Sequence, residues 1–254
     1  MRLRSKVLNV ITHSCYLSQF EPKKVDEALQ DANWNSMHEE LHQFVRNNMW
    51  ELVPKPKGVN VIGIKWIFKN KSDEHGTVIR NKSRLVAQGY IQVEGIDFDE
   101  TFSPVVRLES IRILLAIASH LNFKLYQMNV KSAFLNEMLQ EEVYVEQAKG
   151  FINPHRLDDV YKLKRALYGL KQAPRAWYDR LTTYLIEHGF KRGFADTTLF
   201  IQKDKNYFVV AQIYVNDIVF GATNDSLAQS FADEMKKMFE MRMVGELTYF
   251  LGLQ

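Results

Sequence analysis

Apolar residues recur three or four positions apart in four stretches of the chain, the spacing that places side chains on one face of a helix. These stretches are Trp34 to Val45, Ile111 to Ala118, Trp177 to Leu185 and Leu227 to Met238. Asp31 or Asn33 can cap the first of them. Pro54 and Pro56 are expected to end it, and Pro174 opens the third. The pattern therefore predicts four amphipathic helices.

The segments between these helices alternate in the way typical of β-strands. From Ile62 to Phe68 every second residue is large and apolar, and after a turn at 73–76 a second strand runs from Val78 to Ala87. The two strands predict a long β-hairpin with Trp66 in the core. Further strands are predicted at Leu125 to Val130, Val143 to Val145, Val160 to Leu163, on both sides of the loop Lys203 to Asn206, and in a closing hairpin from Glu240 to Leu253 around Val244-Gly245. This order of elements favours an α+β fold, with a sheet backed by helices on one face.

Polar residues stand where two of the predicted strands end. Asn216 and Asp217 separate the β-prone runs Tyr207 to Val215 and Ile218 to Phe220, and they have the length and chemistry of a tight hairpin turn. Asn129 ends another strand, just before a predicted helix. Taken separately, these residues indicate only a turn and a strand end in an α+β domain. Placed side by side, a strand end and a hairpin tip form the arrangement with which a polymerase palm holds two metal ions.

Composition limits the class of protein. With 254 residues and 46% apolar content, the chain can bury a core as one elongated domain or two lobes. A single cysteine, Cys15, excludes an internal disulfide and fits a reducing intracellular setting. The longest apolar run, Ile113 to Ala118, is far shorter than the roughly 20 residues of a membrane span, so a soluble protein is expected. The first twenty residues carry three basic residues and no acid. Residues 1–24 are interpreted as an upstream stub, with a targeting peptide as the alternative.

Charge is distributed unevenly along the chain. Overall, 33 basic and 30 acidic residues give a net charge of +3. From Lys55 to Tyr90 eight basic residues stand against two acids, and from Val160 to Arg180 six stand against one. Because aromatic residues lie among them, these segments indicate either a polyanion bound through phosphate contacts or an ordinary solvated surface. The acids Asp97, Asp99 and Glu100 are interpreted as a solvated loop, because they lack the glycine-punctuated spacing of a calcium loop.

Six short stretches together have a specific pattern, although each alone is weak. They are Trp50 to Lys57, Ile62 to Lys69, Arg84 to Tyr90, Thr101 to Val105, Leu167 to Trp177 with its Tyr-Gly-Leu-Lys-Gln-Ala-Pro core, and Gly245 to Gln254. On these stretches, the chain from Pro22 onward resembles the reverse transcriptase domain of copia-type LTR retrotransposon polyproteins. The resemblance implies an RNA-directed DNA polymerase that binds an RNA or DNA template-primer and deoxynucleoside triphosphates and uses two Mg²⁺ ions.

The same resemblance implies an arrangement of fingers and palm without a thumb. Residues 25–106 would form a fingers-like part, 107–139 the first part of the palm, and 140–169 a return to the fingers. Residues 170–254 would form the second part of the palm and a primer-grip-like hairpin. The palm expected of this family is an antiparallel split β-α-β sheet backed by helices.

The resemblance also assigns residues to the incoming nucleotide. Phe134 matches the aromatic residue that blocks a ribose 2′-hydroxyl, and Gln172 matches the glutamine beside the nucleotide. Arg84, together with Lys69 or Lys71, matches the cations of the fingers that grip the triphosphate.

The chain departs from the family pattern where the metal ions bind. The pattern places aspartate at residues 129, 216 and 217, whereas this chain has Asn129 and Asn216, so only Asp217 keeps a carboxylate. An amide is nearly isosteric but lacks the charge that attracts Mg²⁺. Losing even one outer-shell partner of a metal typically costs roughly 10–100-fold, so the prediction is a catalytically inactive copy. A nucleic-acid-binding remnant and a weak manganese-dependent polymerase are the alternatives. Glu137 and Ala148, where the family has glycine and proline, are smaller departures.

Overall fold

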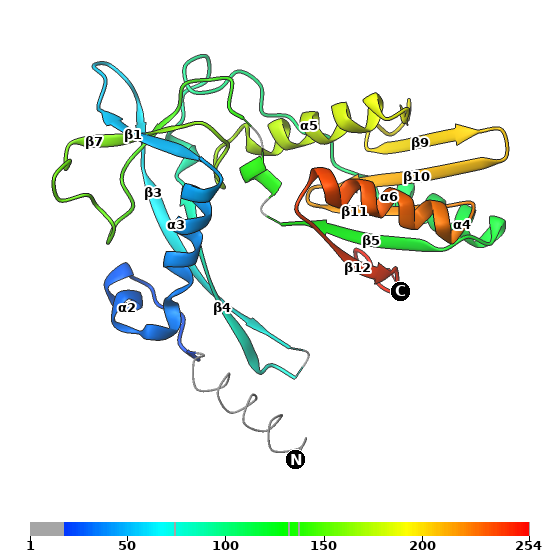
Figure 1. Cartoon of the computed structure of the whole chain (residues 1–254), viewed down its shortest axis with the longest axis horizontal. Helices are drawn as coiled ribbons and strands as arrows, with labels where there is room; N and C mark the ends of the chain where they lie inside the picture. Colours follow the sequence, from blue (N-terminus) through cyan, green and yellow to red (C-terminus); the bar gives the residue numbers. More distant parts are fainter. Residues whose placement is uncertain (1–17, 74, 132, 137, 254) are drawn as a thin grey trace. The chain divides into compact units, whose positions relative to one another are not determined.

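The computed structural model describes residues 18–73, 75–131, 133–136 and 138–253. The predictions for the basic stretch within residues 1–17, for Cys15 and for Glu137 lie outside these residues. The described chain is a mixed fold of α-helices and β-sheets in two compact units (Figure 1). Unit 1 comprises the described parts of Met1–Asp99 and Met138–Lys171, and unit 2 those of Glu100–Glu137 and Gln172–Gln254. Each unit is therefore built from two separate stretches of sequence.

Unit 1 contains two sheets and several short helices. Its elements are α2 (Val25–Gln30), η1 (Ala32–Trp34), α3 (Ser36–Arg46), β1 (Trp50–Pro54), β2 (Val61–Ile62), β3 (Ile64–Ser72), β4 (Val78–Ala87), η2 (Gly89–Ile91), β6 (Tyr144–Val145) and β7 (Asp159–Leu163). One sheet has the order β1-β7-β6-β2, and β3 and β4 form a separate antiparallel pair. The short strands predicted before and after residue 150 are confirmed as β6 and β7.

The long hairpin predicted in unit 1 is confirmed as β3 and β4. Trp66, Phe68 and Leu85 are buried on one face of the pair. On the other face Lys69 lies opposite Lys82. Because successive side chains of a strand point to opposite faces, the large apolar residues at every second position from Ile62 to Phe68 fix which face joins the core.

The first predicted helix is shorter than its apolar pattern. Trp34 lies in the 3₁₀ turn η1, and α3 runs only from Ser36 to Arg46. Val45, which was expected on the apolar face, is 72% exposed. Pro54 does not end the helix but ends strand β1, which pairs with β7. A proline excludes the interior of a helix from its own position but carries no information on what precedes it, so the pattern misses β1.

Unit 2 contains one antiparallel six-stranded sheet and three α-helices among its described residues. Its elements are α4 (Leu108–Leu121), β5 (Leu125–Val130), η3 (Ala133–Asn136), α5 (Ala173–Glu187), β8 (Lys191–Arg192), β9 (Leu199–Asp204), β10 (Tyr207–Tyr214), β11 (Asp217–Ala222), α6 (Asp225–Met238) and β12 (Met241–Glu246). The strand order is β12-β5-β11-β10-β9-β8. Among the described residues, no helix has both the length and the apolar character that a bilayer crossing requires.

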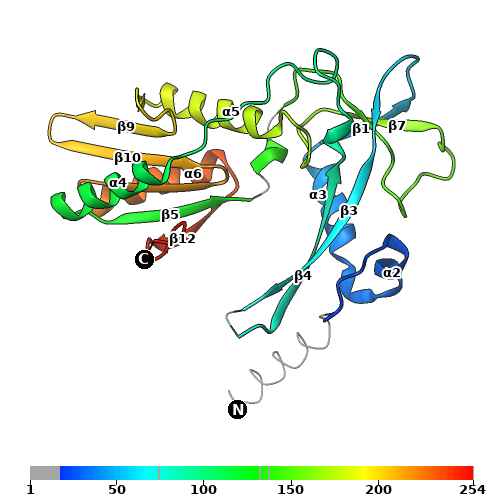
Figure 2. The ribbon, with the colours of Figure 1, turned by 180° about the vertical axis from the view of Figure 1, so that it is seen from behind.

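Helices cover both faces of this sheet, not one face as predicted. Trp177 of α5 and Phe231 of α6 share a buried cluster with Phe220 of β11. Leu114 of α4 packs in a second cluster with Val219, the residue before Phe220. Because neighbouring residues of a strand point to opposite faces, α4 lies on the face opposite α5 and α6. Figure 1 and Figure 2 show α4 and α6 on opposite faces of the sheet.

The closing hairpin predicted at Glu240 to Leu253 is wrong. Strand β12 pairs with β5 at the edge of the sheet, and its register shifts at Gly245. Gly245 has a φ of +135° and marks a β-bulge. No return strand follows β12 among the described residues, where an isolated bridge joins Phe250 and Leu253. A glycine inside a strand pattern fits a bulge as well as a turn, which is why the pattern misleads here.

Three smaller predictions also need correction. The helix expected after Asn129 is only the 3₁₀ turn η3. Met238, expected in the core, is 49% exposed because it lies in the last turn of α6. Asp97 is not solvated but buried, because its Oδ2 accepts hydrogen bonds from the Val93 N–H at 2.8 Å and from Asn60 Nδ2 at 2.7 Å.

Candidate active site

Asn129 and Asp217 lie far apart in the sequence and side by side in the sheet of unit 2. Strands β5 and β11 are paired, and their register places Asn129 opposite Asp217. The Nδ2 group of Asn129 donates a hydrogen bond of 3.0 Å to Oδ1 of Asp217. The strand end and the hairpin tip therefore meet, which excludes the reading in which these residues occupy unrelated positions.

A second amide reaches the same carboxylate oxygen. Gln127 precedes Asn129 by two residues, so both side chains lie on one face of β5. Its Nε2 group donates a hydrogen bond of 2.9 Å to Oδ1 of Asp217. All three side chains are half-buried. Two neutral N–H donors thus converge on one oxygen of Asp217.

The hairpin turn consists of Val215 and Asn216, one residue earlier than predicted, and Asp217 is already the first residue of β11. Val215 has a φ of +52°, in the left-handed region that β-branched residues rarely adopt. Two hydrogen bonds hold this turn. Trp177 Nε1 donates to the Val215 carbonyl at 2.8 Å, and the N–H of Val130 donates to the Asn216 carbonyl at 2.9 Å. Tertiary contacts thus offset the local backbone strain.

The charges around Asp217 nearly cancel. In one row across the sheet, Arg242 of β12 lies opposite Asn129 of β5, and Asn129 lies opposite Asp217 of β11. Asp217 in turn lies opposite Tyr214 of β10. Directly opposed residues of an antiparallel sheet share a face. The row therefore holds one exposed cation and one carboxylate with an amide between them, and it lacks the negative field that a carboxylate cluster would provide.

The residues of this site do not fit a pair of magnesium ions. Mg²⁺ is a hard cation that prefers carboxylate oxygens and dehydrates reluctantly. Of Asn129, Asn216 and Asp217, only Asp217 has a carboxylate, and one of its oxygens already accepts two hydrogen bonds. In the part of the chain that the structure describes, no group of three or more His, Cys, Asp or Glu side chains could hold a metal ion. No metal-dependent step follows from this arrangement.

The residues predicted to contact a nucleotide belong to different units. In unit 2, Phe134 is half-buried against the cluster that contains α5 and α6, and Gln172 is 3% exposed just before α5. In unit 1, Lys69, Lys71 and Arg84 point outward from the β3–β4 hairpin. The hairpin therefore brings the three cations together on one surface.

Two of these cations already have partners within unit 1. Lys69 Nζ lies 3.0 Å from Oε2 of Glu21. A main-chain hydrogen bond and the contact with Lys69 lower the pKa of the Glu21 carboxyl. The guanidinium of Arg84 lies over the ring of Tyr168, 5.0 Å from its centroid. Lys71 forms no ion pair with another described residue, so it is the most available of the three for an anion.

Comparison with protein families identifies the family to which the chain belongs. A family model described as reverse transcriptase (RNA-dependent DNA polymerase) matches residues 47–254. The chain belongs to the reverse transcriptase family. The match includes the strand that carries Asn129 and the hairpin that carries Asp217, so the site described above lies within the family region.

The relatives of this reverse transcriptase domain include transposon polyproteins. The chain is 41% identical over 239 residues to the retrovirus-related Pol polyprotein from transposon RE1 of Arabidopsis thaliana, covering 93% of this chain and 16% of the polyprotein. It is 36% identical over 239 residues to the Pol polyprotein from transposon TNT 1-94 of Nicotiana tabacum, covering 92% of this chain and 18% of the polyprotein. An uncharacterized mitochondrial protein of Arabidopsis thaliana is 51% identical over 102 residues, 40% of this chain and 60% of the relative. The copia-type resemblance is confirmed, and the chain spans less than a fifth of the length of these polyproteins.

Three residues of the candidate site are missed by the sequence pattern. Gln127 could have been found, because it shares a face of a predicted strand with Asn129. Trp177 is a core residue as predicted, and in addition its indole N–H holds the hairpin turn. Arg242 could not be placed, because its strand pairs with β5 instead of folding back as a hairpin.

Proposed function

We propose that this chain contains the fingers and palm of a reverse transcriptase domain that holds nucleic acid but does not extend a primer. Unit 1 corresponds to the fingers and unit 2 to the palm. The ligands that the family implies are an RNA or DNA template-primer and deoxynucleoside triphosphates. The observation that carries the proposal is the bonding of Asp217, whose Oδ1 accepts amide N–H groups from Asn129 and Gln127.

The loss of two carboxylates accounts for the expected inactivity. The chemistry that a pair of magnesium ions supplies in polymerases depends on carboxylate ligands placed close together. Asn129 and Asn216 offer neutral oxygens at these positions. Because losing an outer-shell partner alone typically costs roughly 10–100-fold, losing two direct charges should lower primer extension by several orders of magnitude.

Primer extension tests the proposal directly. The purified chain and the double variant Asn129→Asp plus Asn216→Asp are compared on oligo(dT)-primed poly(rA), first with Mg²⁺ and then with Mn²⁺. We expect extension by the double variant and none by the parent. Comparable extension by the parent with Mg²⁺ would contradict the proposal, and extension by the parent with Mn²⁺ alone would favour a weak manganese-dependent polymerase.

Direct measurement of Mn²⁺ binding separates a metal defect from any other defect in extension. By electron paramagnetic resonance, the double variant should bind Mn²⁺ at least about tenfold more tightly than the parent. The matched control adds Asp217→Asn to the double variant, which should remove the gain. If the double variant binds Mn²⁺ no better than the parent, the two amides are not the cause of inactivity.

A specific feature of unit 1 favours nucleic-acid binding. The outer face of β3 and β4, here called the cationic face, gathers Lys65, Lys69, Lys71, Arg80, Lys82 and Arg84. Burial, followed by the nearby charges of Arg84 and Arg80, lowers the pKa of the Lys82 ammonium. The like charges of this face therefore repel one another, and a phosphate backbone would relieve that repulsion.

Salt-dependent binding tests the role of the cationic face. Fluorescence anisotropy with a labelled RNA–DNA hybrid should show a dissociation constant that rises steeply with salt concentration. Lys71→Gln should weaken binding and reduce the slope of log K against log salt by about 1. Lys237→Gln, which removes an exposed cation from α6, serves as the matched control and should change neither. Binding that is independent of salt, or equally affected by both variants, would argue against this surface.

A further inference from the structure

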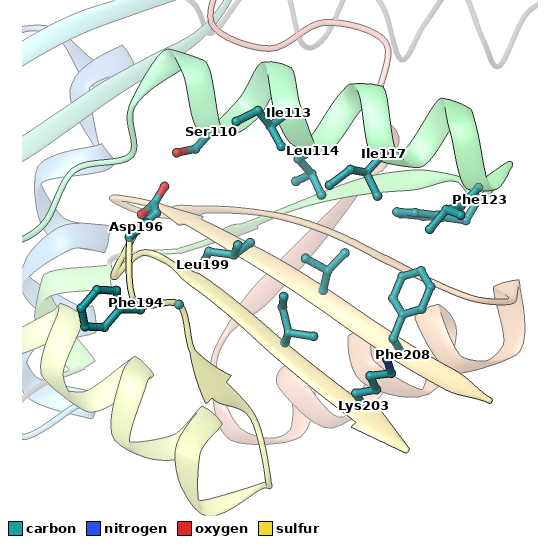
Figure 3. A pocket seen from close by; sticks show the side chains of 15 residues that line it. Ser110, Ile113, Leu114, Ile117, Phe123, Phe194, Asp196, Leu199, Lys203 and Phe208 are labelled. Carbon is teal, nitrogen blue, oxygen red and sulfur yellow. The ribbon is translucent and has the colours of Figure 1, made fainter. Parts of the chain in front are cut away.

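One concave surface of unit 2 shares no residue with the candidate active site. It is a cleft of about 530 Å³ between α4 and strands β9 and β10, shown in Figure 3. Ile201 of β9 and Val210 of β10 line its floor, and Ile113 and Ile117 of α4 line one wall. We call it the α4 cleft.

Helix α4 presents an apolar ridge to this cleft. Ile113, Ile117 and Leu121 are spaced four residues apart, so they lie in one row along the helix. Their exposed fractions are 59%, 44% and 54%, and Phe194 at one end of the cleft is fully exposed. Contiguous exposed apolar surface of this kind marks a site of interaction.

The α4 cleft has the dimensions of a helix-binding groove. Helix α4 packs over β10 and β11 through Val210 and Val219, and the next pair of strands, β9 and β8, lies two strand positions away from that pair. With neighbouring strands about 4.8 Å apart, this displacement is about 9.6 Å. Helices that pack side by side lie about 8–10 Å apart. A helix over β9 and its neighbour β8 would therefore contact both the ridge of α4 and the floor of the cleft.

The outer rim of the cleft is positively charged. Lys203 lines the cleft at the end near Phe208. Lys191 of β8 lies opposite Ile201, so it projects from the same face of the sheet. Neither lysine forms an ion pair with another described residue. Asp196, the acid that lines the other end, accepts hydrogen bonds from neighbouring side chains and main chain, so its charge is already engaged.

We infer that the α4 cleft binds an amphipathic α-helix of a partner protein, with acidic residues on the flank that faces β8. The ridge of α4 and the floor of the cleft bury the apolar stripe of this helix, while Lys191 and Lys203 pair with its acids. Along the strand direction, Lys203 lies two residues beyond the position of Lys191, a distance of about 7 Å. Acids four residues apart on a helix are separated by about 6 Å, which matches this spacing.

Two synthetic peptides test the charge complementarity. Both peptides carry the same leucine stripe and a side-chain crosslink on the solvent face. The crosslink is needed because a short isolated helix is marginally stable in water. One peptide has glutamates four residues apart on one flank, and the other has lysines at those positions. In fluorescence anisotropy with the full chain, the glutamate peptide should bind and the lysine peptide should bind at least about tenfold more weakly.

Variants of the chain locate the binding surface. Ile117→Glu should weaken binding of the glutamate peptide at least about tenfold, because it places a like charge in the apolar contact. Ile186→Glu is the matched control, since Ile186 is 50% exposed on α5, on the opposite face of the sheet. It should leave binding unchanged. The double variant Lys191→Glu plus Lys203→Glu should reverse the preference between the two peptides, which a simple loss of structure cannot do.

Several outcomes would overturn the inference. Equal binding of the two peptides, or binding that Ile117→Glu leaves unchanged, would show that the cleft does not select an acidic helix. Self-association in light scattering that Ile117→Glu abolishes would show that a second copy of the chain covers the cleft. Binding to phosphatidylglycerol vesicles that Ile117→Glu abolishes would identify the surface as lipid-binding instead.

Discussion

Replacing Asn129 by aspartate should make the metal-free chain less stable and give it a response to metal. In the parent, Nδ2 of Asn129 lies 3.0 Å from Oδ1 of Asp217 and donates a hydrogen bond to it. In Asn129→Asp this donor becomes a second carboxylate oxygen. The variant therefore exchanges an attraction for a repulsion at a single pair of atoms.

The size of the effect follows from this geometry. Two unit charges about 4 Å apart repel by about 4 kcal/mol at an effective dielectric constant of 20. The lost hydrogen bond to a charged acceptor was worth about 1.5–3 kcal/mol. Both side chains are half-buried, so solvent screening and rotation of the new carboxylate reduce the sum. We expect unit 2 to lose about 2 kcal/mol of unfolding free energy at neutral pH.

Urea denaturation in the presence of EDTA measures this loss. With an m-value of about 2 kcal/mol per molar urea, the midpoint of unit 2 should fall by about 1 M. Asn206→Asp is the matched control, because it makes the same chemical change at an exposed turn of the same sheet, and its midpoint should stay nearly unchanged. Millimolar Mn²⁺ should raise the midpoint of Asn129→Asp and leave both the parent and Asn206→Asp where they were.

Two results would refute this account of how the side chains at 129 and 217 interact and bind metal. If Asn129→Asp is as stable as the parent in EDTA, the side chains at 129 and 217 do not interact as the hydrogen bond implies. If Mn²⁺ stabilises the parent as much as the variant, the parent already binds the ion, and the argument that one carboxylate is too few fails.

Three further predictions concern the fold. Trp177→Phe removes the indole donor to the Val215 carbonyl and should destabilise unit 2 by about 1 kcal/mol in urea; an unchanged midpoint would show that packing alone holds the turn. Burial raises the pKa of Glu40 above 4.5, so the folded state holds this proton more tightly, and stability should fall as the pH rises from 4.5 through the raised pKa. Glu40→Gln should flatten that part of the stability profile, and a profile parallel to the parent would contradict the assignment. Gly169→Ala should prevent unit 1 from folding, because the φ of residue 169 is +90° and the new Cβ would lie 2.2 Å from a main-chain oxygen. Gly76→Ala, where φ is +80° and the Cβ would meet open space, should cost only about 1 kcal/mol of unfolding free energy. Equal losses of stability in circular dichroism melting would refute the steric argument.

The sequence predicts most reliably where local and tertiary preferences agree. The β3–β4 hairpin is found because its alternation, its turn and its burial all indicate the same register. Strand β1 is missed because it ends at Pro54, a residue that also terminates helices. The position of the β10–β11 turn is missed by one residue, because Trp177 holds Val215 in a conformation that local rules assign to Asn or Gly.

The candidate site, too, could be predicted from the sequence only in part. The meeting of Asn129 and Asp217 is expected from the resemblance to a palm, and the strand register shows it. The hydrogen bonds to Asp217 could not be predicted, because they depend on side-chain orientations within the sheet. Arg242 joins the row only through the pairing of β12 with β5, a non-local contact without a sequence signature.

The interleaving of the two units determines when each can fold during synthesis. Strand β1 pairs only with β7 among the described strands, and β7 is made after the entire first segment of unit 2. Because translation adds about 5–20 residues per second, β7 is synthesised roughly 5–20 s after β1, and β1 remains without its partner strand for that time. During that interval the nascent chain offers an unpaired strand that begins with Trp50 to any other strand nearby. A chaperone that shields extended segments until translation has passed β7 would therefore protect β1 from pairing with a non-native strand.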